Sequence, residues 1–223
     1  MRPRLPDRRT AGQLLAEAVA DWLADRPDLP PPVVLALPRG GVPVAAEVAE
    51  RLGAPLDLVM VRKIGVPDQP ELAAAAVVEG DPPTRVENRE VIAACGIGEA
   101  ELEAAERREL AEIARRRAAW MAGRPPPPVE GRTVIVVDDG VATGATTRAA
   151  LAALRARSPA ALVLAVPVAP AETLARLRGE VDTALCLATP EPFWAIGVHY
   201  DDFAQLTDAE VIDTLARFAP PAD

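Results

Sequence analysis

The sequence is poor in lysine, histidine, cysteine and aromatic residues, and the shortages of histidine and cysteine argue against particular kinds of site. Lys63 is the one lysine among 24 basic residues. His199 is the one histidine; we interpret it as structural, since no Ser/His/Asp constellation can be assigned to it. Cys95 and Cys186 are far apart and form no CxxC motif, which argues against a zinc site and a disulfide framework. Both are expected to be small buried apolar residues.

The chain also lacks a long apolar run and an excess of positive charge. No apolar run approaches the ~20 residues that span a bilayer. Residues 1–9 carry charges but no apolar core of a signal peptide, so a cytoplasmic location without a membrane partner is expected. The net charge of −9 argues against a nucleic-acid partner, which would require a basic face. A small anionic ligand held by local backbone amides remains compatible with that charge.

What the chain does have is enough apolar sequence for a full core. Half of its 223 residues are hydrophobic, which predicts a single α/β domain over 1–223. Apolar runs alternate with amphipathic segments, and this alternation predicts a doubly wound parallel sheet of about five strands with helices on both faces. The expected strands are 33–37, 56–61, 133–137, 162–166 and 183–187, and the expected helices are 7–26, 42–52, 99–123, 171–178 and one ending near 157.

Residues 64–88 interrupt that alternation. They hold four prolines and two glycines, and they are expected to form an active-site loop or hairpin with an extended stretch at 73–79. Asn88 is expected to cap a short helix that Gly96 closes. The segment also supplies three candidate proton acceptors: Glu71, Glu79 and Asp81.

A second interruption, at about 96–130, reads as an insertion of a charged helix and a proline-rich connector. Its carboxylates precede its arginines, an order that complements the helix dipole. Glu103/Arg107 and Glu112/Arg116 are spaced as i,i+4 ion pairs. We expect a solvated, self-supporting helix; the alternative is an arm that covers the site or meets a second subunit.

The most informative segment is 134–147, VIVVDDGVATGATT. A buried strand delivers Asp138 and Asp139 at its carboxyl end, and a loop of small residues then opens a helix. Gly140 and Gly144 permit close backbone approach to an anion at the helix N-terminus. The loop is not a Walker A motif, because no GK[ST] follows. Two carboxylates before a phosphate loop indicate a ligand with both a hydroxyl-bearing sugar and a phosphate.

This segment resembles the phosphoribosyl pyrophosphate (PRPP) signature of type I phosphoribosyltransferases: four apolar residues, two acidic residues and a loop ending TG-x-T-T. The resemblance implies that Asp138 and Asp139 contact the ribose hydroxyls and act in catalysis and in Mg²⁺ binding. It also implies that Thr143, Gly144, Ala145, Thr146 and Thr147 hold the 5′-phosphate, with Gly140 and Ala142 as further substrate-binding residues of the loop.

Two further segments fit the same resemblance. The run Pro38, Arg39, Gly40 and Gly41 looks like the family's pyrophosphate loop, with Arg39 as a catalytic cation. Arg62 and Lys63, expected to end the next strand, resemble a basic pair that reaches the same pyrophosphate. A lone lysine there is notable because a compact ammonium differs from a planar guanidinium. All three segments are expected at carboxyl ends of strands, where doubly wound sheets bind ligands.

A hood is expected at about 188–206, where the few aromatic residues cluster. It looks like the hood of purine salvage phosphoribosyltransferases. By that match Phe193 and Trp194 form a base-stacking platform, and Asp201 is a carboxylate for the magnesium–pyrophosphate end. The alternative is a small hydrophobic satellite core.

The resemblance implies transfer of the 5-phosphoribosyl group from PRPP to a nitrogenous base, with pyrophosphate as product and Mg²⁺ as cofactor. A homodimer and a role in nucleotide salvage follow from the same likeness. Ala142 stands where 6-oxopurine enzymes carry an aspartate that handles the base's proton, which alanine cannot do. The loop's Ala-Thr-Gly resembles adenine-type enzymes better, so a purine-like acceptor is favoured but not identified. The alternatives are a catalytically silent PRPP- or nucleotide-sensing regulator and a phosphohydrolase with an aspartate nucleophile.

Overall fold

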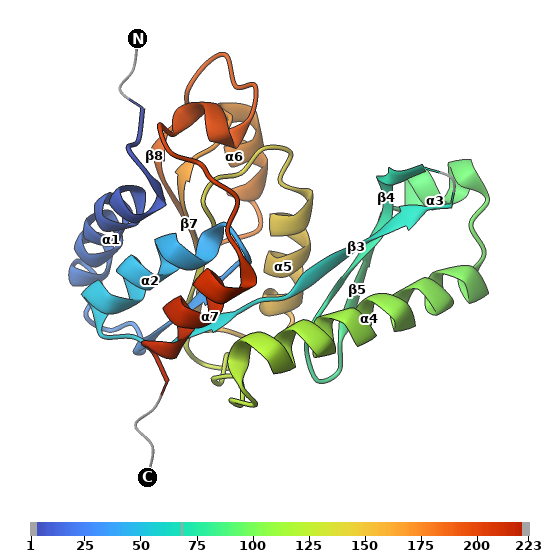
Figure 1. Cartoon of the computed structure of the whole chain (residues 1–223), viewed down its shortest axis with the longest axis horizontal. Coiled ribbons are helices and arrows are strands. Elements are labelled where there is room, and N and C mark those ends of the chain that lie inside the picture. Colours follow the sequence, from blue (N-terminus) through green and yellow to red (C-terminus); the bar gives the residue numbers. More distant parts are fainter. Residues whose placement is uncertain (1–3, 68, 220–223) are drawn as a thin grey trace.

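The computed structural model describes residues 4–67 and 69–219, without the side chains of Pro70 and Glu71. The proton-acceptor role predicted for Glu71, and the outer ends of the predicted 1–223 domain, therefore lie outside the described residues. The helices are α1 Arg8–Ala24, α2 Gly41–Leu52, α3 Arg89–Cys95, α4 Glu99–Met121, α5 Ala145–Arg155, α6 Ala171–Leu177 and α7 Asp208–Ala216, with a 3-10 turn at Ile196–His199. The strands are β1 Pro32–Ala36, β2 Leu56–Leu58, β3 Val61–Val66, β4 Gln69–Val78, β5 Thr84–Glu87, β6 Thr133–Val137, β7 Ala161–Val168 and β8 Thr183–Ala188. Helices and strands alternate from α1 to β2 and from β6 to β8, whereas β2 to β5 and then α3 and α4 follow one another without alternation (Figure 1).

Five of the described strands form a parallel sheet in the order β2-β1-β6-β7-β8. In the inner strands β1, β6 and β7, alternate residues enter two separate apolar cores. On one face Val34 and Ile135 meet α1, α2 and α7, and on the other Leu35 and Val136 meet α5 and α6. Both faces are covered, which explains why these strands read as continuous apolar runs. The predicted fold class, a doubly wound α/β sheet, is confirmed.

The sheet order reverses between β1 and β6, because β2 lies on one side of β1 while β6, β7 and β8 follow on the other. Loops that leave neighbouring strands at such a point diverge to opposite faces and open a crevice between them. In this chain the loops at that point are 38–41 and 138–144. The topology thus brings together two segments separated by about a hundred residues.

The region 64–88 forms more than the expected loop or hairpin. β3, β4 and β5 pair as an antiparallel sheet that projects from the core, with α3 near its outer end (Figure 1). The predicted strand 56–61 is wrong in its extent, because β2 stops at Leu58 and β3 begins at Val61. Arg62 and Lys63 therefore lie inside β3 rather than after a core strand. Asn88 and Gly96 cap α3 as predicted.

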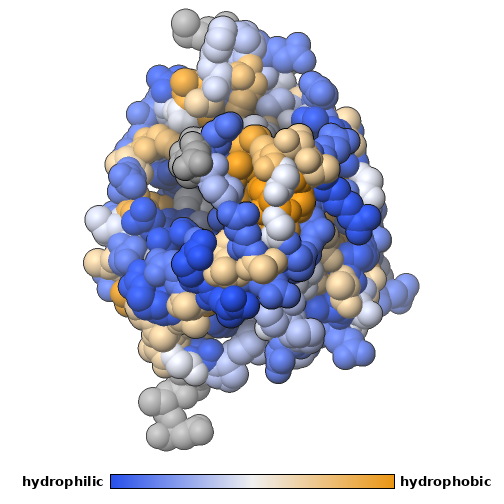
Figure 2. Space-filling model, turned by 90° about the vertical axis from the view of Figure 1, so that its right-hand side faces the viewer, coloured by the Kyte–Doolittle hydropathy of each residue, from blue (hydrophilic) through white to orange (hydrophobic). Residues whose placement is uncertain are grey.

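The prediction of a solvated, self-supporting helix for α4 is wrong. α4 lies along the antiparallel sheet (Figure 1) and buries Leu102, Ile113, Trp120 and Met121 in the same core as β3 and β4. Its charged face still forms the predicted pairs, with Glu103–Arg107 at 3.8 Å and Glu112–Arg116 at 2.6 Å. The outer end of this arm is mostly hydrophilic with a limited apolar area (Figure 2).

The structure also bears on the predictions for the two cysteines and for membrane-spanning segments. Cys95 is exposed and Cys186 is half-buried, so the prediction that both are buried is wrong. Cys95 ends the short helix α3 at the outer end of the arm, where little protein is available to cover it. None of the helices in the described part of the chain is long and apolar enough to cross a membrane.

Candidate active site

The 38–41 and 138–144 loops touch each other at the carboxyl edge of the sheet. The amide of Leu37 donates to the carbonyl of Val137 at 2.9 Å, and the peptide between Pro38 and Arg39 is cis. A methyl group on Gly41 would lie 2.7 Å from that same carbonyl, and one on Gly40 would collide with the Asp139 carboxylate. Only glycine permits this approach, so both glycines are explained by the contact itself.

Asp139 is buried and held by two residues from distant segments. The Nε of Arg8 donates to its carboxylate at 2.8 Å, and the hydroxyl of Tyr200 donates to its backbone carbonyl at 2.6 Å. Arg8 also donates to the carbonyl of Ala204 at 2.8 Å and lies 3.8 Å from the ring centroid of Phe203. Arg8 therefore joins the start of α1, the end of β6 and the 188–206 segment.

Burial disfavours the charged forms of the two adjacent carboxyl groups, Asp138 and Asp139. It raises the pKa of Asp138 well above its ordinary value, and the neighbouring Asp139 charge raises it further. Burial also raises the pKa of Asp139, and the guanidinium of Arg8 opposes that rise. A hydroxyl donor or a cation would stabilise the charged forms of these two buried carboxyl groups. The pair therefore suits a ligand that brings either one.

The 138–144 loop leads into the N-terminus of α5. Gly144 has φ +79°, a left-handed conformation that suits glycine, and its position turns the first amides of α5 toward the loop. The hydroxyl of Thr173 on α6 holds the loop by donating to the carbonyl of Ala142 at 2.9 Å. Ala142, Thr143 and Ala145 are exposed, Thr146 is half-buried, and Thr147 is buried. The first amides of a helix have no partner within it, so the start of α5 and the exposed Thr143 suit an anion.

A pocket of about 330 Å³ opens between the two loops and the C-terminal segment. Its lining residues are Arg8, Arg39, Gly40, Asp139, Phe203, Gln205 and Leu206. Arg39 lies 3.4 Å from Asp208 in the first turn of α7. Two arginines and a buried carboxylate therefore face the same space, which suits a ligand with both anionic groups and hydroxyls.

The 188–206 segment contains the small hydrophobic core that was the alternative interpretation of the hood. Phe193 packs with Ile196 and Phe203 against a small core of Ala11, Val168 and Tyr200, so a satellite core exists. Trp194 is 81% exposed and therefore stays available for stacking. His199 is half-buried with its ring centroid 4.7 Å from that of Phe193, in keeping with a structural role.

The two residues of the predicted basic pair, Arg62 and Lys63, have different surroundings. Arg62 donates to Glu109 of α4 at 2.7 Å and thus fastens the arm. Lys63 is exposed on β3 and forms no ion pair with a described residue. Neither residue lines the pocket beside Asp139. Glu79 and Asp81 line a different cavity, next to the carboxyl end of α5.

The three predicted metal carboxylates are not assembled in one place. Asp201 lies 3.4 Å from Arg4, and both side chains are largely exposed. Within residues 4–67 and 69–219 there is no group of three or more histidine, cysteine, aspartate or glutamate side chains that could hold a metal ion. Of the three, Asp138 and Asp139 are adjacent in the chain and lie at the loop crossing.

Sequence analysis missed Arg8 and Tyr200 as parts of the site. No local pattern marks Arg8, since it is one of many arginines in the N-terminal stretch. Tyr200 had a weak signal: it is the one tyrosine, and a buried tyrosine usually finds a hydrogen-bond acceptor. α7 was also missed, although Thr207 and Glu210 form a capping box that the sequence displays.

Comparison with known proteins gives a consistent result. A family model described as phosphoribosyl transferase domain matches residues 8–202. A protein of Mycobacterium tuberculosis, provisionally named a phosphoribosyl transferase, is 46% identical over 211 residues, which are 95% of this chain and 46% of that protein. The chain thus spans about half the length of the curated relatives it matches.

Solved structures agree with the fold. The crystal structure of TT1426 from Thermus thermophilus is 42% identical and superposes with a TM-score of 0.82, over 97% of this chain and 100% of that one. The AQ2163 protein from Aquifex aeolicus is 13% identical with a TM-score of 0.50, over 81% of this chain and 73% of that one. This second likeness shows the fold alone.

Proposed function

The chain belongs to the phosphoribosyl transferase family, and from that premise we propose that it transfers the 5-phosphoribosyl group of PRPP to a nitrogenous base and releases pyrophosphate. The observation that carries the proposal is the crossing of the 38–41 and 138–144 loops, with Gly40 against the Asp139 carboxylate. Asp139, Arg39 and Gly40 line one pocket at this crossing, and the 138–144 loop continues from it to the N-terminus of α5. PRPP is a ribose with a phosphate at one end and a pyrophosphate at the other. Its hydroxyls suit the carboxylates, and its two anionic ends suit the cation and the helix N-terminus.

We assign the two phosphorylated ends of PRPP to the two loops. The α5 N-terminus, with hydroxyls of Thr143, Thr146 and Thr147, binds the 5′-phosphate. The amides of Gly40 and Gly41 and the guanidinium of Arg39 bind the pyrophosphate. Lys63 is a further proposed contact of the pyrophosphate. This contact requires β3 to move toward the site.

The carboxylates act on the sugar between those ends. Asp138 and Asp139 accept hydrogen bonds from the ribose 2′- and 3′-hydroxyls. In the transfer, a bond forms between the base nitrogen and C1 of the ribose, while the bond from C1 to the pyrophosphate oxygen breaks and pyrophosphate leaves with the electron pair. Positive charge builds on the ribose, and nearby carboxylates stabilise it electrostatically.

The residues present also fit a magnesium ion. Mg²⁺ usually takes one or two carboxylates and completes its shell with water and substrate phosphates. Asp138 accepts from the Asp139 amide with one oxygen at 2.9 Å, and its second oxygen accepts no hydrogen bond from a described residue. Asp138 and Asp139 would hold the ion together with bound PRPP. Asp201 would bind it only if its ion pair with Arg4 were broken. When bound, the ion neutralises the leaving pyrophosphate.

The base is proposed to stack on Trp194, whose exposure leaves its ring free. A purine-like base is favoured by the Ala-Thr-Gly sequence of the 138–144 loop. The base's proton has no assigned acceptor, since Glu79 and Asp81 lie beside the other end of α5.

The decisive experiment measures pyrophosphate release from magnesium-PRPP with a panel of purines, pyrimidines and related heterocycles, beside calorimetric PRPP binding. We expect release that depends on one base. The variant carrying Asp138→Asn and Asp139→Asn should bind PRPP at least ~100-fold more weakly while unfolding cooperatively, whereas the exposed Asp213→Asn control should bind normally. Tight PRPP binding without release for any base would favour the sensing regulator, and retained affinity in the double variant would refute the ribose contacts.

A further inference from the structure

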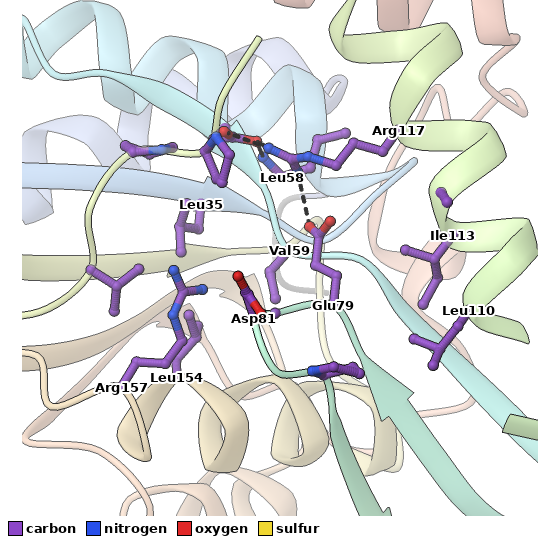
Figure 3. A pocket seen from close by; sticks show the side chains of 17 residues that line it. Leu35, Leu58, Val59, Glu79, Asp81, Leu110, Ile113, Arg117, Leu154 and Arg157 are labelled. Carbon is purple, nitrogen blue, oxygen red and sulfur yellow. Dashed lines mark hydrogen bonds and ion pairs between the residues drawn. The ribbon is translucent and has the colours of Figure 1, made fainter. Parts of the chain in front are cut away.

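A second cavity, of about 530 Å³, lies between the parallel sheet and α4 (Figure 3). It borders the carboxyl end of α5, whereas the phosphate loop borders the amino end of the same helix. α5 has 11 residues, so the two places are roughly 16 Å apart at a rise of 1.5 Å per residue. The cavity shares no lining residue with the pocket beside Asp139.

The walls of this cavity are mainly apolar and come from several separate parts of the fold. Figure 3 shows Leu110 and Ile113 of α4 facing Leu154 of α5 across the space, with Leu35 of β1 behind. Val59 and the connector residues Pro126 and Val129 continue the same surface. Side chains from independent elements thus enclose a space large enough for a small molecule, within the 300–1,000 Å³ typical of ligand sites.

One edge of the cavity is a closed network of three charges. Arg117 donates to both carboxylate oxygens of Asp57 at 2.9 Å and to Glu79 at 3.0 Å (Figure 3). Asp57 is only 2% exposed, and Glu79 also accepts from the amide of Met60 at 3.0 Å. These groups satisfy one another, so they fix the shape of the site and leave no net positive charge for a ligand.

Arg157 is different, because its charge is unmatched. It follows α5, is half-buried on the cavity lining, and forms no side-chain hydrogen bond or ion pair with a described residue. Asp81, on the loop after β4, is the remaining charged lining residue, and no ion pair joins it to Arg157. A half-buried guanidinium beside an apolar space gains most from an anion that arrives with an apolar body.

We propose that this cavity is a second ligand site, which takes an apolar small molecule carrying one anionic group, with the apolar body between α4 and α5 and the anion on Arg157. The apolar walls provide affinity by removing nonpolar surface from water. Arg157 provides selectivity for the anion, and Asp81 limits affinity through like-charge repulsion. The site does not depend on the proposed transferase reaction.

The test uses two fluorescent probes and the full chain. 8-Anilinonaphthalene-1-sulfonate is an apolar molecule with one sulfonate, and N-phenyl-1-naphthylamine is its uncharged counterpart. We expect saturable binding of both to the wild-type chain. Arg157→Gln should weaken the sulfonate about tenfold and leave the uncharged probe unchanged. Asp81→Asn should tighten the sulfonate alone, and Ala114→Trp, which fills the cavity from α4, should weaken both.

The matched control is Arg148→Gln, an exposed arginine near the amino end of α5, the helix that Arg157 follows, and this variant should bind both probes as the wild type does. Near-UV circular dichroism of every variant excludes a loosened state that binds such dyes nonspecifically. Absence of saturable binding, or equal losses of both probes in Arg157→Gln, would overturn the proposal. Should Ala114→Trp fail to fold, the opposite shifts expected for Arg157→Gln and Asp81→Asn still decide the question.

Discussion

The side chain of Arg8 lies 2.8 Å from the carboxylate of Asp139, although 131 positions separate the two residues. The same guanidinium contacts the carbonyl of Ala204 and the ring of Phe203. One residue at the start of α1 therefore positions both the carboxylate proposed to meet the ribose and the segment proposed to cover the base. Ligand binding at Asp139 has to accommodate or displace that contact.

Replacing Arg8 should therefore reduce stability more than a surface arginine would. Arg8→Ala leaves a buried carboxylate without its partner, and we expect the free energy of unfolding to fall by about 2–3 kcal/mol. Arg9→Ala is the matched control, because Arg9 is 74% exposed and pairs with Glu47 at the surface, a contact worth at most about 1 kcal/mol. Urea unfolding of the two variants measures the difference. Equal losses would contradict the assigned role of Arg8.

Trp194→Ala should change ligand binding without changing stability. Its side chain is largely exposed, so the free energy of unfolding should stay within about 0.5 kcal/mol of the wild type. Loss of stacking should weaken binding of the base by about 1–3 kcal/mol. Fluorescence titration of the PRPP complex with the best base measures this, and Val198→Ala, exposed in the same segment, is the control. A base that binds Trp194→Ala normally would remove the tryptophan from the site.

Arg62 and Lys63, adjacent in sequence, should give opposite results. Arg62→Ala breaks the ion pair with Glu109 and should lower stability, by an amount limited to about 1 kcal/mol by partial exposure. Lys63→Ala touches no described partner and should leave stability unchanged, but it should weaken PRPP and pyrophosphate binding more than ribose 5-phosphate binding. Calorimetry with the three ligands checks this. Equal losses for all three ligands would remove Lys63 from the pyrophosphate site.

Glu79 should make stability depend on pH in an identifiable window. Burial raises the pKa of its carboxyl, and Arg117 only partly opposes that rise. The folded state therefore binds this proton more tightly than the unfolded state does. The contribution of Glu79 is present below its unfolded pKa, about 4.3, and is lost as pH rises through the folded value.

Glu79→Gln should remove that dependence, because glutamine does not titrate. The free energy of unfolding of the wild type, relative to the variant, should decline as pH rises from about 4.3. Urea unfolding at a series of pH values gives the difference directly. A constant difference across the series would show that Glu79 titrates alike in both states.

The elements predicted correctly are those whose signals are local. β6 covers the predicted residues 133–137, since the four consecutive apolar residues after Thr133 suit a strand that is buried on both faces. α3 begins and ends as predicted because Asn88 accepts the amide of Val91 and Gly96 takes the left-handed conformation. Each signal depends on residues within a few positions of one another.

The failures share a cause as well. The apolar run from Leu56 predicts one strand, but the chain leaves the parallel sheet at Leu58 and enters a second sheet at Val61. The charges of α4 predict a solvated helix, yet its apolar positions are covered by β3 and β4. Whether such a segment is buried depends on which distant strand lies beside it, and no short pattern records that.

The sequence by itself determined the family, the alternation of strands and helices, and the loop types at the candidate site, because backbone conformation and phosphate cradles are encoded by adjacent residues. Only the tertiary structure decided that Arg8 would meet Asp139, that Arg62 would bind α4, and that Arg157 would face an apolar cavity. Those relationships join residues that are far apart in the chain. They arise when the two cores close, because the strand order and the packed helices then fix which side chains share a space.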